Sequence, residues 1–273
     1  MLIQTSIPAH LCAALIFLPG SVALAHDFWI EPQNFRPQVQ EPVPIVLRVG
    51  EDFTGTSQPL IPQWFSDYAA SGPGETIQVV GYIGDDPAGS FRPTAPGNWV
   101  VGYRSTQAFV EIEPPKFNTY LEKEGLEWVI EARAKSGEAE TNARELYSRC
   151  AKSLVRVGDK PVTGGFDTVL GYRLELIPEK DPYKLKPGDE LPVRLEYEDK
   201  PLEGTLIVAF RAENPEQKQQ LRTDASGRVK IELRATGTWL IKGVHIIELP
   251  DTNEQADWES FWASLTFELD DDA

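Results

Sequence analysis

The sequence predicts a mainly β protein with two β-sandwich domains, the first of which carries a helical insertion. Short segments with alternating apolar residues recur in both halves of the chain, separated by turns rich in Gly, Pro and Asp. Between the halves, the apolar residues change to helical spacing. A short motif in the first half also recurs in the second. The expected boundaries are 1–25 for a signal peptide, 26–164 for the first domain and 165–273 for the second.

The first 25 residues have the layout of a secretory signal peptide. An apolar run at 11–18 is broken by Pro19 and Gly20 and is followed by small residues at Ala23 and Ala25. No Lys or Arg precedes the run, which departs from the usual pattern. The run is much shorter than the ~20 apolar residues of a spanning helix, so we expect cleavage after Ala25 and no remaining membrane anchor.

The composition limits the cellular compartments and the classes of partner that suit this chain. The chain has 273 residues and a formal net charge of −16, which makes nucleic acid an unsuitable partner. Cleavage would remove Cys12 and leave Cys150 alone, so the mature chain could form no internal disulfide. An exported chain without disulfides indicates a bacterial periplasm and a domain large enough to fold without them.

Alternating segments place the expected strands of the first domain. They lie at 43–49, 76–82, 99–103 and 109–112. The stretch 54–74 is rich in Pro, Gly and Ser and is expected to form a long loop that holds three aromatic residues.

The helical insertion is expected at about 117–154. Leu126, Val129 and Ile130 form one apolar stripe, and a second stripe runs through the part after Gly137. The charged residues between these positions are expected to be exposed; they are Glu127, Arg133, Arg144, Glu145, Arg149 and Lys152.

The second domain returns to short strands. Expected strands lie at 172–176, 191–197, 206–210, 229–233, 239–247 and 261–269. The repeated motif begins at Ala95 and again at Ala235, and in both copies a Gly comes two residues before a Trp that starts an apolar strand. Two related sandwiches would explain this repeat, although two copies can also arise by chance.

A processed N-terminal His has unusual chemistry. The α-amine and the imidazole Nδ1 of His26 can close one chelate ring on a metal ion, and both lose their protons at little cost when a metal competes near neutral pH. His245, inside a strand, is the other His of the mature chain. Together they would form a three-nitrogen site suited to Ni, Co, Cu or Zn, with Asp27 completing or orienting it. The alternatives are a hydrogen-bonded strand residue for His245 and an unstructured end for His26.

Two resemblances are specific enough to name. The segment 201–204, followed by Thr223-Asp224-Ala225-Ser226-Gly227, resembles the edge of transthyretin-like and carboxypeptidase-regulatory-like sandwiches, which implies a fold of this immunoglobulin-like class for the last 100 residues or so. Over most of its length the chain resembles the DUF4198 family. The matching segments are His26-Asp27-Phe28-Trp29, Arg144-Glu145-Leu146-Tyr147-Ser148-Arg149, Gly237-Thr238-Trp239-Leu240-Ile241 with His245, and 258–267. That resemblance implies a periplasmic component of nickel or cobalt uptake.

We therefore expect a non-catalytic metal carrier or sensor that supplies a metal transporter of the inner membrane. No phosphate-binding loop, zinc-protease motif or serine triad is present in the sequence. A carbohydrate-binding or interaction module is one alternative, and a copper oxidase of the histidine-brace kind is another.

Overall fold

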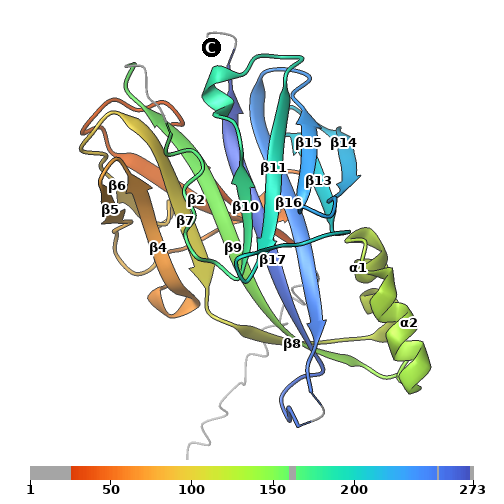
Figure 1. Ribbon diagram of the computed structural model, residues 1–273. Helices are drawn as coiled ribbons and strands as arrows, with labels where there is room; N and C mark the ends of the chain where they lie inside the picture. The colour runs from red at the N-terminus through yellow and green to blue at the C-terminus, as the bar shows by residue number, and fades with distance from the viewer. Residues whose placement is uncertain (1–25, 160–163, 251, 271–273) are drawn as a thin grey trace, which may run out of the picture.

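A computed structural model describes residues 26–159, 164–250 and 252–270. Within these residues the chain is mainly β, as predicted, and its strands form a large central sheet and two smaller sheets (Figure 1). The two smaller sheets pack on opposite faces of the central one, so each half of the molecule is a sandwich.

The central sheet runs through both halves of the chain. Its strand order is β14-β13-β16-β17-β9-β7-β4-β5, with β8 also paired to β9. Neighbouring strands are antiparallel except for β17 and β9, which are parallel and join the two halves. The strands are β4 Phe65–Gly72, β5 Glu75–Gln78, β7 Gly97–Ser105, β8 Ala108–Ile112, β9 Ala143–Val157, β13 Leu206–Arg211, β14 Asn214–Arg222, β16 Gly237–Glu248 and β17 Trp258–Leu269.

The N-terminal sheet covers one face of the central sheet. It consists of β1 Asp27–Pro32, β2 Val43–Glu51, β3 Thr54–Gln58 and β6 Ser90–Phe91. Its apolar side chains, among them Phe28 and Ile30, pack with Trp99 and Val101 of β7. The Thr266 hydroxyl of β17 donates a hydrogen bond to the Ile30 carbonyl of β1. We call this side of the central sheet the β1 face.

The C-terminal sheet covers the opposite face. It consists of β10 Leu174–Pro178, β11 Glu190–Tyr197, β12 Lys200–Pro201 and β15 Arg228–Glu232, and Figure 1 shows β10 and β11 in front of the central sheet. Val193 and Leu195 of β11 pack with Ile241 and Phe261 of the central sheet in the second core. We call this side the β11 face.

The two helices follow β8 and precede β9 in the chain, and they form a separate layer. α1 spans Pro114–Lys123 and α2 spans Glu127–Ser136, and short 3-10 turns occur at Pro62–Trp64 and Pro182–Lys184. Phe117, Tyr120 and Leu121 of α1 pack against Val244 and Trp262 of the central sheet. The helices therefore cover part of the β1 face, beside the point where β1 begins.

The predicted helical insertion is wrong in its second half. Residues 143–157 form β9, the strand at the centre of the molecule, and the helices occupy only 114–136. β9 is buried on both faces for most of its length, so its apolar residues do not alternate and their spacing resembles that of a helix. Three of the charges expected to be exposed are in fact buried: Arg133, Glu145 and Lys152.

The expected loop at 54–74 is also wrong. It contains β3, a 3-10 turn and β4, and Tyr68 within it is buried. The polar edge strand β14 was not predicted, because its sequence has no alternating apolar pattern.

The repeated motif has the same structure in both halves. The Trp99 indole donates a hydrogen bond to the Ala95 carbonyl, and the Trp239 indole donates one to the Ala235 carbonyl, each at 3.1 Å. Each Trp packs into the core of its own sandwich. The motif therefore has the same local structure at both places, within one shared sheet.

Candidate functional site

His26 lies directly before β1 and is half-buried. It lines a pocket on the β1 face whose other walls come from β8, α1, β9 and β17. The remaining lining residues are Val110, Ile112, Tyr120, Glu145, Tyr147, Arg149 and Trp262. β1 pairs with β2 from Asp27 onward, and this pairing fixes the point at which His26 enters the pocket.

Glu145 is the acidic residue of this pocket. Its side chain is 2% exposed, and its Oε1 accepts hydrogen bonds from the Tyr120 hydroxyl at 3.3 Å and from the Ser260 hydroxyl. Its Oε2 is buried and has no hydrogen-bond partner among the described residues. Burial raises the pKa of Glu145 to about 7, although the Ser260 and Tyr120 hydrogen bonds oppose this.

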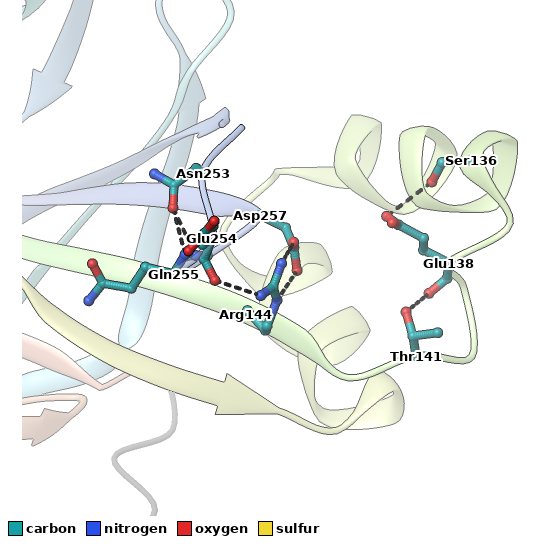
Figure 2. Close-up of polar contacts among 9 residues, drawn as sticks. Ser136, Glu138, Thr141, Arg144, Asn253, Glu254, Gln255 and Asp257 are labelled. Atoms are coloured by element: carbon teal, nitrogen blue, oxygen red, sulfur yellow. Dashed lines mark hydrogen bonds and ion pairs between the residues drawn. The ribbon is translucent and has the colours of Figure 1, made fainter. Parts of the chain in front are cut away.

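The residue next to Glu145 holds this end of β9 in place. The Arg144 guanidinium pairs with the Asp257 carboxylate and donates a hydrogen bond of 3.1 Å to the Glu254 carbonyl (Figure 2). The Asn253 side chain accepts hydrogen bonds from the Gln255 and Ala256 amides in the same loop. These contacts fix the start of β9 against the start of β17, and thereby fix where Glu145 and Ser260 meet.

Asp27 has a different role from the one expected. Its Oδ1 accepts a hydrogen bond of 2.6 Å from the ammonium group of Lys242 on β16, which also binds Glu124 at 2.9 Å. Burial alone would lower the pKa of Lys242, but the two carboxylates more than offset it and raise that pKa. Asp27 is therefore engaged by Lys242 and is not among the residues that line the His26 pocket.

The structure does not bring His245 to His26. The His245 ring lies 4.5 Å from the Tyr197 ring of β11, and its neighbours Val244 and Ile246 pack on the helix side. His245 therefore points to the β11 face, while His26 lines a pocket on the β1 face. Burial, aided by the Arg173 charge, lowers the pKa of His245 to about 4.

The expected metal ligands His26, His245 and Asp27 therefore do not share one site. Within the described part of the chain, no group of three or more His, Cys, Asp or Glu side chains could hold a metal ion. His26 and Glu145 are the two such residues that line the same pocket. The expected cleavage after Ala25 lies outside the described residues.

Glu145 was missed because its segment was expected to be helical and exposed. A strand at 143–157 would have placed Glu145, Tyr147 and Arg149 on one face, since alternate residues share a face. The burial of Glu145 depends on Tyr120 and Ser260, which are distant in sequence.

A search of known families matches a domain of unknown function, DUF4198, over residues 23–247, and the chain belongs to this family. A search of curated proteins finds no match. No described helix has the length and apolar character needed to cross a bilayer.

Two solved structures have distant similarity to the chain. The D0-D1 domain of intimin is 12% identical with a TM-score of 0.22, and the match covers 88% of this chain and 97% of that one. A point mutant of Salmonella alpha-2-macroglobulin is 13% identical with a TM-score of 0.23, and the match covers 95% of this chain and 16% of that one. At these scores neither supports an argument about function.

Proposed function

We propose that this member of the DUF4198 family is an exported, non-catalytic protein of the periplasm that binds a divalent transition metal ion. Its ligands are the amine and imidazole of His26 and the carboxylate of Glu145. The bound metal, which is nickel, cobalt or copper, is passed to a transporter of the inner membrane.

The observation that carries this proposal is the unpartnered Oε2 atom of Glu145 in the pocket that His26 lines. A buried polar atom without a partner costs about 1 to 3 kcal/mol, and more when the group is charged. A metal ion in the pocket would give this oxygen a partner. Ser260 and Tyr120 bind the other oxygen and would orient the carboxylate toward the ion.

The donor set suits the proposed metals. Amine and imidazole nitrogens with one carboxylate oxygen favour nickel, copper and cobalt over calcium or magnesium. The amine exists as a ligand only if the chain is cleaved after Ala25, so export and metal binding would be linked.

Isothermal titration with Ni(II), Co(II) and Cu(II) tests the proposal. The mature protein that begins at His26 is compared with a form that has one Gly before His26, which converts the amine to a non-basic amide. We expect the added residue, and separately Glu145→Gln, to weaken binding by about tenfold or more.

His245→Gln is the matched control, because it removes the other imidazole from the opposite face of the sheet. It should leave the metal affinity unchanged. Equal affinity in the mature and extended forms would refute the amine ligand, and loss of binding in His245→Gln would refute this choice of ligands. Oxygen consumption with a reductant and bound copper would instead favour an oxidase.

A further inference from the structure

Arg149 occupies an unusual position beside the proposed metal pocket. Its guanidinium carbon lies 5.1 Å from the centre of the Phe28 ring and 5.6 Å from the centre of the Tyr147 ring. The Ser105 hydroxyl accepts a hydrogen bond of 2.9 Å from the Arg149 main-chain amide, which fixes the backbone at this point. The side chain is therefore held between two aromatic rings.

No carboxylate among the described residues lies within ion-pair distance of this guanidinium. Arg173, by contrast, pairs with Glu198 at 2.7 Å and with Glu259 at 2.8 Å. The side chain is half-buried, and this burial lowers the pKa of Arg149, although the Asp27 charge opposes the shift. A partly desolvated cation without an ion-pair partner favours an anionic ligand.

A groove next to the metal pocket supplies room for such a ligand. Phe28, Trp64 and Tyr103 form its aromatic walls, and Gln58 and Thr106 add polar groups. Trp64 is 48% exposed, so the groove opens to solvent. Tyr147 and Arg149 line both this groove and the pocket of His26 and Glu145, so the two spaces adjoin.

We propose that this groove binds the carboxylate of a small polycarboxylate through Arg149, and that the metal reaches His26 as a complex with that chelator. This inference rests on the proposed metal function. A guanidinium that stacks on aromatic rings keeps its N–H edge for a bidentate contact with a carboxylate. One ligand molecule can then contact Arg149 while its metal ion lies at His26.

Titration calorimetry of the mature protein tests this with three probes: citrate, nickel chloride and nickel citrate. Arg149→Gln should lower the affinity for citrate and nickel citrate by about tenfold or more, since charge-assisted bidentate bonds are lost. The affinity for nickel chloride should not fall, because removal of a nearby positive charge does not disfavour a cation.

Arg104→Gln is the matched control. Arg104 lies on the neighbouring strand β7 and contacts Tyr172 on the β11 face, so its loss should leave all three affinities unchanged. Should Arg149→Gln fail to fold, wild-type binding of citrate but not of its uncharged triamide supports the same conclusion.

Equal citrate affinity in wild type and Arg149→Gln would overturn the inference, as would an absence of citrate binding to wild type. If citrate binds through Arg149 but nickel chloride does not bind wild type, the metal function fails while the carboxylate site stands. The two proposals can therefore fail separately.

Discussion

Glu145→Gln should make the metal-free protein more stable at alkaline pH while it weakens metal binding. The wild-type carboxyl has a pKa of about 7 in the folded chain, against 4.5 as its ordinary value, because it is buried. Between these two values the folded state binds the proton more tightly than the unfolded state. The contribution of the protonated Glu145 carboxyl to stability is therefore fully present below about pH 4.5 and is lost as pH rises through 7.

The size of the effect follows from the difference between the two pKa values. At 1.36 kcal/mol per pH unit, a difference of about 2.5 gives about 3 kcal/mol. Glutamine cannot ionise, and its carbonyl can still accept the hydrogen bonds from Tyr120 and Ser260. We therefore expect little difference between the proteins at pH 5 and a gain of about 3 kcal/mol for Glu145→Gln at pH 8.5.

Urea unfolding of metal-free protein from pH 5 to 8.5 measures this difference. Glu259→Gln is the matched control, since Glu259 lies on the adjacent strand β17 and pairs with Arg173. That variant should show no gain at pH 8.5. Parallel stability curves for wild type and Glu145→Gln would refute the assignment of a buried, proton-binding carboxyl.

Three other predictions concern buried polar groups. Lys242→Met should lower the free energy of unfolding by about 3 to 5 kcal/mol at pH 7, because Asp27 and Glu124 lose their counter-ion. A smaller loss in the triple variant that also carries Asp27→Asn and Glu124→Gln would confirm this cause. The pKa of His245 is about 4 in the folded chain, against 6.5 as its ordinary value. The contribution of neutral His245 to stability should therefore be fully present above pH 6.5 and fall toward pH 4. His245→Gln should reduce this decline when unfolding is measured at acid pH. Trp99→Phe and Trp239→Phe should each cost about 1 to 3 kcal/mol, because each leaves an Ala carbonyl without its partner, and a cost in only one half would contradict the structural repeat.

Sequence reasoning succeeded where apolar residues alternate and where a short apolar run follows a turn signal. β2 and β11 carry an apolar residue at every second position and were placed close to their observed bounds. β7 and β16 are buried on both faces and were recognised instead as apolar runs that begin at a Trp after a Gly. The fold class and the family followed from such strands, from the repeated Trp motif and from the segments that resemble DUF4198.

It failed where burial comes from distant parts of the chain. β9 is covered on both faces by sheets that are far away in sequence, so its pattern gave no sign of a strand. Lys152 is buried because Glu175 binds its ammonium group at 2.8 Å, and no local pattern predicts that pair.

The predicted site failed for a related reason. The N-terminal segment does lie beside β16, because Asp27 binds Lys242 of that strand. The face of β16 that a given residue occupies depends on the strand's register, and His245 comes three positions after Lys242. That odd number places the His on the opposite face.

The contacts of β1 hold His26 in a fixed position for metal binding. Asp27 is held by Lys242, and Phe28 packs against Tyr103 at 4.8 Å and beside Arg149, so the two residues after His26 are anchored on opposite sides of β1. An anchored strand leaves the His26 amine and ring few orientations to lose on metal binding, which lowers the entropic cost of chelation. Asp27→Asn should therefore weaken nickel binding by less than Glu145→Gln does, since it loosens the anchor without removing a ligand. A larger loss in Asp27→Asn, measured by the same titration, would show that Asp27 is itself a ligand.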